Sequence, residues 1–232
     1  MISRRQVLYF SALLAFWGPF VRFKSFAAND DRNKYAELYP FTLTSLKDAY
    51  RSEMMANRHY LSYCQKALSE NYPNIAYLFS SLAVSEKIHA DNYLELILSL
   101  GSSLESTDFP VSISTTKTNL NTAAIKELDK INEFYPEIFK KLSTESHDQA
   151  IIDCMYSWKS HQQHEMMINK IKKYSGFFFG SLARKIESMD PNYYVCEICG
   201  STIDENPITP CEICNYPSSH YTKLDRPILS VN

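Results

Sequence analysis

Glycine is scarce in this sequence, with only 5 residues among 232, whereas it usually makes up about 7% of a protein. A β-rich fold needs many tight turns, so this shortage indicates a few long helices rather than many short strands. An excess of positive charge is also lacking, because the formal net charge is −2. There is therefore no electrostatic reason to expect nucleic acid as a partner. The hydrophobic content of 45% supplies a core and excludes a disordered chain.

Long uninterrupted apolar runs are lacking too. The run over residues 7–21 is broken by polar and helix-breaking residues, and it is too short for a comfortable membrane span. Arg4 and Arg5 precede it, and small residues two apart follow at positions 25–27, which is typical of a cleaved export signal over residues 1–28. The paired arginines resemble the twin-arginine type of signal. We therefore expect a periplasmic or otherwise exported protein with no span in its mature chain, and an uncleaved N-terminal anchor is the alternative.

The spacing of apolar residues predicts four helices in the rest of the chain. The expected ranges are residues 42–71 with an N-cap at Thr42 or Thr44, 73–100, 120–142 with a kink at Pro136, and 145–174. A polar segment of residues 102–118 separates the second helix from the third, and a connection of that length favours a crossover. We expect an all-α four-helix bundle over residues 40–175, a linker over 176–190 and a small module over 191–225.

The module contains the most specific pattern in the sequence, two C-x-x-C knuckles. They are formed by Cys196 with Cys199 and by Cys211 with Cys214. A segment this small is not held by a core alone, and four thiolates at this spacing can close tetrahedrally around one iron or zinc ion. Gly200 lets the backbone turn so that amides can point at sulfur. Two disulfides are the alternative in an exported chain, although adjacent C-x-x-C pairs favour a metal.

A second set of metal-ligating residue types recurs on the four predicted helices. The helices carry, in chain order, Glu53, Glu86-x-x-His89, Glu127 and His161-x-x-His164. Residues three apart share one helix face, and the separations 86 − 53 = 33 and 161 − 127 = 34 show that the two halves repeat one plan. One Glu on each of two helices, with Glu-x-x-His on the other two, is the ligand plan of dinuclear carboxylate bundles. Each residue alone would be unremarkable, but together they predict a metal site.

Several segments of the chain resemble the rubrerythrins. The resembling segments are Glu53-Met-Met-Ala-Asn-Arg58-His-Tyr60, Ala83-x-x-Glu86-x-x-His89-Ala90, Ala123-Ala-Ile-Lys-Glu127, Phe134-Tyr135-Pro136-Glu137-Ile-Phe139 and the two knuckles. The likeness covers about residues 42–222. It implies a ferritin-like diiron bundle with one long crossover, and a rubredoxin-like module with one iron. It also implies reduction of hydrogen peroxide to water, a redox donor protein, and a head-to-tail homodimer in which the module serves the partner subunit.

The resemblance also implies roles for individual residues. The bundle metals would be held by Glu53, Glu86, His89, Glu127, His161 and His164, and the module iron by Cys196, Cys199, Cys211 and Cys214. Tyr60 and Tyr135 match family tyrosines near the metals, where they could donate hydrogen bonds to a bound oxygen species. Ordinary core packing is the alternative for two buried aromatic residues.

Two positions depart from the family pattern. Lys130 stands where the third helix normally carries a second Glu, and His161 stands where the fourth normally carries a Glu. Both changes remove negative charge, so we expect a higher potential at the bundle site, with His89 as a fixed ligand and with zinc or manganese as plausible substitutes. Lys130 is expected either to neutralise a bound anion or to donate a proton after desolvation lowers its pKa, and a solvent-reaching side chain is the alternative.

Three functions remain open at this stage. The leading one is an exported oxidoreductase that reduces peroxide at the bundle site. The rivals are a non-catalytic metal-binding protein and a ferritin-like protein that oxidises iron with dioxygen. The remaining cysteines, Cys64 and Cys154, are expected to be buried residues about 27 Å apart along the bundle, since each helical residue rises about 1.5 Å.

Overall fold

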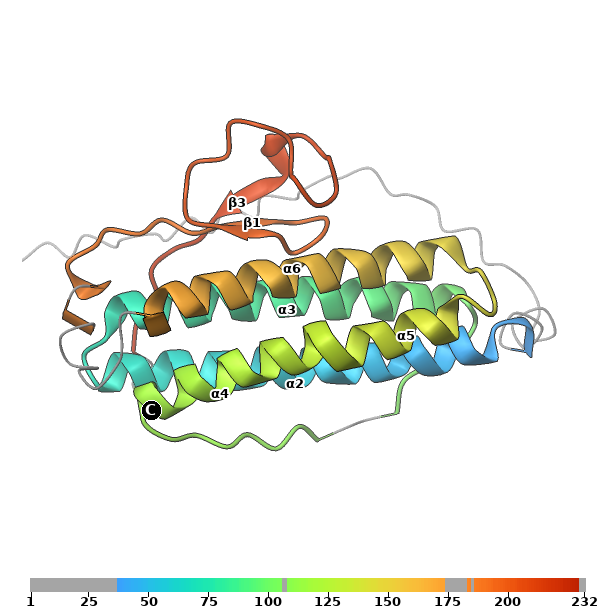
Figure 1. The fold of residues 1–232 in the computed structure, drawn as a ribbon, viewed down its shortest axis with the longest axis horizontal. Coiled ribbons are helices and arrows are strands. Elements are labelled where there is room, and N and C mark those ends of the chain that lie inside the picture. Colours follow the sequence, from blue (N-terminus) through green and yellow to red (C-terminus); the bar gives the residue numbers. More distant parts are fainter. Residues whose placement is uncertain (1–36, 106–107, 174–182, 185, 230–232) are drawn as a thin grey trace, which may run out of the picture.

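Long helices form most of the described chain, which comprises residues 37–105, 108–173, 183–184 and 186–229 of a computed structural model (Figure 1). The helices are α2 (Pro40–Ser69), α3 (Pro73–Ser99), α4 (Thr116–Asp129), α5 (Tyr135–Leu142) and α6 (Asp148–Lys173). Together they make the expected ferritin-like bundle, with α4 and α5 acting as one interrupted helix. The predicted export signal, residues 1–28, lies outside the described residues, as does much of the predicted linker. Among the helices described, none is both long and apolar enough to cross a membrane.

The N-terminus of α2 is capped by a glutamate from a distant part of the chain. We expected Thr42 or Thr44 to cap the first helix, which is wrong, because α2 begins at Pro40 and its N-cap Tyr39 makes no side-chain bond. The Glu145 carboxylate instead accepts hydrogen bonds from the amides of Phe41 and Thr42, at 2.9 and 2.8 Å. A carboxylate satisfies the free N–H groups of a first turn and complements the helix dipole.

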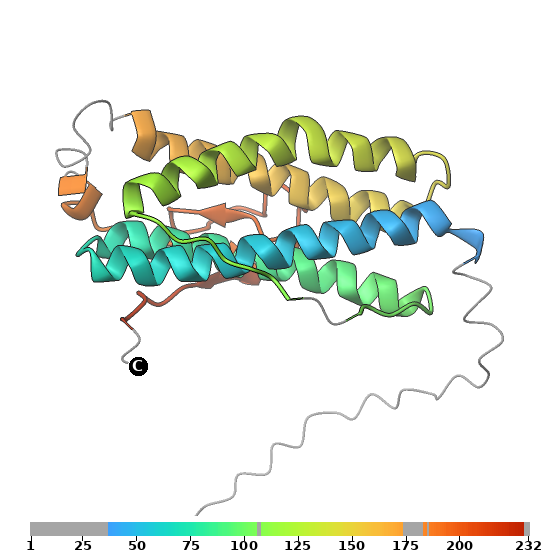
Figure 2. The same ribbon diagram turned by 90° about the horizontal axis from the view of Figure 1, so that it is seen from below.

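The segment between α3 and α4 runs the length of the bundle, as expected (Figure 2). It lies against α2, where Phe109 is buried beneath the guanidinium of Arg58. Because the crossover returns the chain to the end at which α3 began, α4 runs parallel to α3 and α6 parallel to α2 (Figure 1). This topology brings the middles of all four helices together.

A π-helical turn, η1 (Lys130–Phe134), interrupts the third helix. Its defining bond runs from the Tyr135 amide to the Lys130 carbonyl, five residues back. The expected kink at Pro136 is therefore a widened turn, and Pro136 lies in the first turn of α5, where no amide is needed. A π turn brings residues five apart onto one face, so Lys130 and Tyr135 both point into the bundle.

Two apolar clusters fill the bundle on either side of its polar middle. Cys64 lies in the first cluster and Cys154 in the second, and both thiols are free and buried. This confirms the expectation that both are buried, and neither forms a disulfide. Burial raises the pKa of the Cys64 thiol to about 11, so both cysteines act as packing residues.

The C-terminal module is a small antiparallel sheet that packs on the bundle. Its strands are β1 (Tyr194–Cys196), β2 (Thr202–Ile203) and β3 (Tyr221–Lys223), in the order β2-β1-β3, with a short 3₁₀ helix, η2 (Ser218–His220), before β3. In Figure 1 the module sits over α3 and α6, and both helices contact its strands. The module therefore lies directly above the polar middle of its own bundle.

Candidate metal centre

The middle of the bundle contains six buried residues of metal-ligating type, all of which the sequence had singled out. Each is at most 1% exposed, and they come from four helices: Glu53 on α2, Glu86 and His89 on α3, Glu127 on α4, and His161 and His164 on α6. Their side-chain atoms form two groups in which all ligand atoms lie within 4.8 Å of one another. The groups are Glu53, Glu86, His89 and His161, here called set A, and Glu86, Glu127, His161 and His164, here called set B.

In set A, both oxygens of Glu53 are engaged by the π turn. The Lys130 ammonium lies 2.6 Å from Glu53 Oε2, and the Tyr135 hydroxyl donates to Glu53 Oε1 at 2.5 Å. Lys130 is only 8% exposed, so the alternative of a solvent-reaching side chain is wrong. The cause is the π turn, which turns this residue inward toward three carboxylates.

In set B, the Glu127 carboxylate is held from two sides. His161 Nδ1 lies 2.7 Å from Glu127 Oε2, and the Tyr60 hydroxyl donates a hydrogen bond to Glu127 Oε1. Burial and the neighbouring Glu127 raise the pKa of Tyr60 well above its usual range, so Tyr60 remains a proton donor. Both expected tyrosines therefore contact residues of the ligand sets directly.

Among the residues that the structure describes, two buried atoms of set B meet no partner with hydrogen-bond geometry. They are Glu86 Oε1 and His164 Nδ1, which face each other at 3.3 Å. The other ring nitrogen, His164 Nε2, lies 3.4 Å from the Ser160 hydroxyl, as a metal-bound imidazole is usually oriented. A buried carboxylate oxygen and a buried imidazole nitrogen left unpaired are costly unless a cation lies between them. The residues present thus fit a bound divalent metal ion.

Three carboxylates dominate the electrostatics of the site. Burial and the Lys130 ammonium oppose the charging of His161, yet Glu86, Glu53 and Glu127 outweigh them and raise its pKa to about 10. Burial likewise opposes the charge of Lys130, but Glu53, Glu86 and Glu127 raise the pKa of this ammonium above its usual value. The expectation that desolvation would lower the pKa of Lys130 is therefore wrong, because the adjacent carboxylates outweigh burial.

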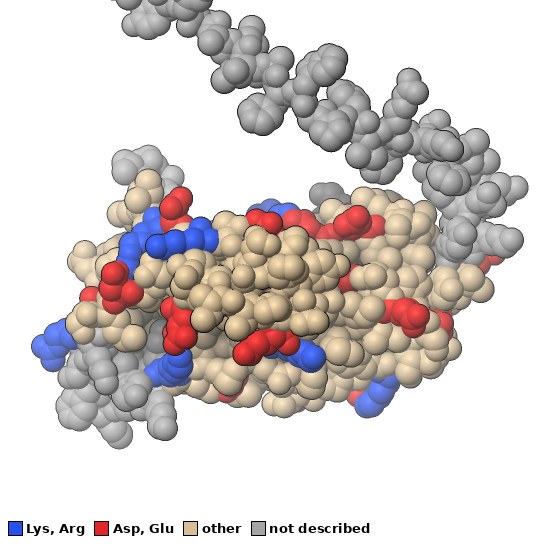
Figure 3. Space-filling model, turned by 90° about the horizontal axis from the view of Figure 1, so that it is seen from above, with Lys and Arg blue, Asp and Glu red and all other residues tan. Residues whose placement is uncertain are grey.

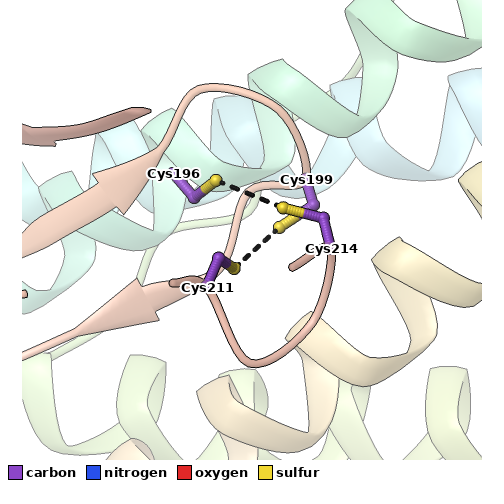
Figure 4. Close-up of side chains that lie close together, drawn as sticks. All are labelled: Cys196, Cys199, Cys211 and Cys214. Carbon is purple, nitrogen blue, oxygen red and sulfur yellow. Dashed lines mark hydrogen bonds between the residues drawn. The ribbon is translucent and has the colours of Figure 1, made fainter. Parts of the chain in front are cut away.

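The four knuckle cysteines converge in the module (Figure 4). Sγ atoms of Cys196 and Cys214 are 3.7 Å apart, and those of Cys199 and Cys211 are 3.5 Å apart. A disulfide needs about 2.05 Å, whereas sulfurs at the corners of a tetrahedron with metal–sulfur bonds of about 2.3 Å are separated by about 3.8 Å. All four thiols are free, so the geometry favours a Cys₄ metal site over the disulfide alternative.

One hydrogen bond to this sulfur cluster comes from a residue that the sequence reasoning missed. The Tyr221 hydroxyl donates to Cys211 Sγ at 3.3 Å and lies 2.9 Å from the Ser201 hydroxyl. A donor to a thiolate stabilises the more negative, reduced state of a bound iron. We expect Tyr221→Phe to lower the module's reduction potential by on the order of 20–60 mV, the equivalent of about 0.5–1.5 kcal/mol for one electron. Spectroelectrochemistry measures the shift.

Tyr216 supplies the matched control for that variant. It is also in the second knuckle region and is 46% exposed, and its hydroxyl donates no hydrogen bond to sulfur within the described part of the chain. Tyr216→Phe should leave the potential within a few millivolts of the wild type, on the order of the measuring error. Equal shifts in both variants would contradict a specific role for the Tyr221 hydroxyl.

The module contacts the bundle at the first knuckle. His89 Nε2 lies 3.1 Å from the Cys199 carbonyl oxygen, and the Ser85 and Ser160 hydroxyls donate to the Gly200 carbonyl at 2.6 and 3.0 Å. Gly200 has φ +73° and packs so closely that an added Cβ would lie 2.4 Å from His89 Nε2. The glycine was expected for the turn of the knuckle, but its close approach to His89 was not. One chain thus brings its own module to its own bundle site, and the head-to-tail dimer stays a prediction.

The serine contacts were not foreseen either. Ser85 and Ser160 lie directly before Glu86 and His161 in the sequence, but a small polar residue on a helix gives no sequence signal for a carbonyl that approaches from another module. The π turn was missed for a similar reason, because the helical pattern around Pro136 predicts only an irregularity and not its type.

Comparison with known proteins identifies what this arrangement is similar to. The rubrerythrin family model matches residues 45–172. Rubrerythrin-2 of Clostridium acetobutylicum is 29% identical over 178 residues, which are 75% of this chain and 91% of that protein. Nigerythrin of Nitratidesulfovibrio vulgaris is 24% identical over 183 residues, which are 78% of this chain and 85% of that protein.

Solved structures show the same fold. Fully reduced, all-ferrous nigerythrin superposes with a TM-score of 0.66 at 23% identity, covering 79% of this chain and 86% of that one. A bacterioferritin of Desulfovibrio desulfuricans, whose diiron site was captured in different catalytic states, gives a TM-score of 0.59 at 18% identity and covers 68% of this chain and 91% of that one. The bundle and its crossover are therefore the ferritin-like architecture that the sequence predicted.

Proposed function

This chain belongs to the rubrerythrin family, and from that premise we propose that it is an iron-dependent oxidoreductase that reduces hydrogen peroxide to water. The overall reaction cleaves the O–O bond, takes up two electrons and two protons, and releases two molecules of water. A redox donor protein would supply the electrons one at a time through the Cys₄ site of the module. The observation that carries the proposal is the contact of His89 Nε2 with the Cys199 carbonyl, which joins the two candidate metal sites.

The chain's own residues support this chemistry by holding the metal and by holding protons. Iron bound by set B, with set A beside it, would supply the redox chemistry that cleaves peroxide. The Tyr60 hydroxyl donates its proton to Glu127, and the Tyr135 hydroxyl and the Lys130 ammonium donate theirs to Glu53. The π turn fixes two of these donors by placing Lys130 and Tyr135 on one face. These groups would orient a small oxidant and return protons to its oxygens.

A cavity of about 280 Å³ between α2 and the third helix offers the oxidant an entry route. Its lining includes Tyr60 and Lys130 at the metal centre, together with Ala56, Ala123 and Phe134. Apolar walls admit a small neutral molecule such as peroxide more readily than an ion. The cavity therefore supports a peroxide or dioxygen substrate over a charged one.

The contact between module and bundle supports the electron relay. Cys199 would hold the module iron, and its own carbonyl oxygen contacts the ring of His89, which belongs to set A. His89 Nδ1 in turn lies 3.3 Å from Glu86 Oε2, and Glu86 belongs to both ligand sets. The donor protein would dock over the module, whose face in Figure 3 has uncharged side chains at its centre and both acidic and basic ones around them. We propose that this exchange takes place outside the cytoplasm, where the predicted export signal would send the chain.

Peroxide-driven reoxidation of the module tests the proposal. The protein is reduced anaerobically, mixed with one equivalent of hydrogen peroxide, and followed by the return of the ferric–thiolate absorption. We expect reoxidation at least about 100-fold faster than in a Glu127→Ala, His164→Ala double variant, which cannot hold the bundle metal. The same experiment with dioxygen in place of peroxide separates the peroxidase from an iron-oxidising protein.

Two results would overturn the peroxidase assignment. One is equal reoxidation in the wild type and the double variant, which would mean that the bundle site takes no part. The other is protein that contains zinc at both sites and shows no ferric–thiolate absorption, which would favour the non-catalytic metal-binding protein.

A further inference from the structure

The two ligand sets of the bundle do not offer metal positions of equal quality. Sets A and B share Glu86 and His161, so they represent two neighbouring positions, as in a dinuclear site. They differ in whether their ligand atoms already have hydrogen-bond or ion-pair partners, and Lys130 causes the difference. We infer that the bundle holds one divalent metal ion in set B, and that the Lys130 ammonium takes the place of the second metal in set A.

The ammonium of Lys130 contacts most of set A. It lies 2.6 Å from Glu53 Oε2, 3.6 Å from Glu86 Oε2 and 3.4 Å from His161 Nε2. These are three of the four residues that a metal at this position would use. A Lys ammonium is a compact point charge with three donors, so it can replace a cation among carboxylates. With Tyr135 on its other oxygen, Glu53 has no free oxygen to offer without losing one of these partners.

Set B shows the opposite condition. Its two unpartnered atoms, Glu86 Oε1 and His164 Nδ1, are fully buried and face each other. The second nitrogen of His161, Nε2, lies 3.2 Å from Glu53 Oε1 while Nδ1 faces Glu127. Nε2 is closer to this carboxylate than to the Lys130 ammonium, which lies 3.4 Å away, so the ring donates from Nε2 to Glu53 and presents Nδ1 as a ligand. Set B is therefore short of a cation, and set A already contains one.

Charge balance leads to the same count. The three buried carboxylates contribute −3 and Lys130 contributes +1, so with neutral, ligating histidines the site carries −2. One divalent ion neutralises this charge, whereas two would leave +2 in a buried site, which is strongly unfavourable. Two neutral units then lie side by side. One is the Glu53 carboxylate with the Lys130 ammonium, and the other is the metal ion with Glu86 and Glu127.

Metal content tests the inference directly. Metal-free protein is loaded anaerobically with Fe(II), freed of excess iron and analysed for total iron per chain. The module iron is then measured by its ferric–thiolate absorption and subtracted from the total. We expect one bundle iron in the wild type and two in Lys130→Glu, whose four carboxylates would balance two divalent ions. Lys126→Glu is the matched control, because Lys126 is on the same helix with a side chain 71% exposed. It should keep one.

Two bundle irons in the wild type would overturn the inference, as would a single iron in a folded Lys130→Glu variant. If that variant does not fold, the wild type loaded with Mn(II) decides, because manganese avoids the thiolate site. One ion gives the hyperfine pattern of isolated Mn(II), and a spin-coupled pair contradicts the inference. The inference rests on the proposed function only for the choice of iron. A single bundle iron without peroxide turnover would refute that function alone, and two irons with turnover would refute the inference alone.

Discussion

Replacing Gly200 by alanine is expected to slow peroxide-driven reoxidation of the module by on the order of 100-fold, while both sites keep their metal. The new Cβ would lie 2.4 and 2.8 Å from atoms of the His89 ring and 2.9 Å from Ser85 Oγ, and real carbon atoms do not approach so closely. The first knuckle must therefore move away from α3 and lose the contact between Cys199 and His89. A displacement of about 1 Å at a reacting interface can cost about 100-fold in rate. Stopped-flow absorption at the ferric–thiolate band measures it.

Asn215 provides the control for this variant within the same module. It follows the second knuckle as Gly200 follows the first, with φ +61°, but it is exposed. Asn215→Ala therefore introduces the backbone strain of an alanine at positive φ, about 1–2 kcal/mol, without a clash against the bundle. We expect its reoxidation rate to stay within about twofold of the wild type. Slowing by the same factor in both variants would mean that strain in the knuckle, and not docking on His89, limits the rate.

Removing the module metal is expected to unfold residues 191–225 and leave the bundle helical. The sheet has strands of only two or three residues, too short to be stable without a second source of free energy. Its buried cluster consists of the four knuckle cysteines. Metal binding to such a site contributes about 10–16 kcal/mol to folding. Hydrogen exchange before and after chelation should show loss of protection in the strand amides, with α2 and α3 still protected.

Cysteine variants separate metal loss from thiol chemistry in general. Cys211→Ser should reproduce the effect of chelation, whereas Cys64→Ser, at a free thiol buried in the bundle, should leave exchange in the module unchanged. Protection of the strand amides that survives chelation would show that the contacts with α3 and α6 alone hold the module folded.

Much of the site could be predicted from the sequence because helices and knuckles are local structures. Periodicity places Glu53, Glu86 and Glu127 mid-helix, and the three-residue spacing fixes Glu86 with His89, and His161 with His164, on common faces. Four such helices with one long connection have few ways to pack. The N-cap of the first helix was mispredicted because its cap, Glu145, lies 103 residues from Thr42, a separation at which local sequence carries no signal.

The sequence by itself therefore determined the ligand types, their helices and the Cys₄ module, since each depends on spacing within one element. Only the tertiary structure decided what Lys130 does and where Gly200 lies. The direction of the Lys130 side chain depends on a π turn and on carboxylates of three other helix segments. The role of Gly200 depends on a module that contacts α3 from 115 residues further along the chain. Both involve the meeting of distant buried groups, whose energies depend on separations of a few ångströms that no local pattern records.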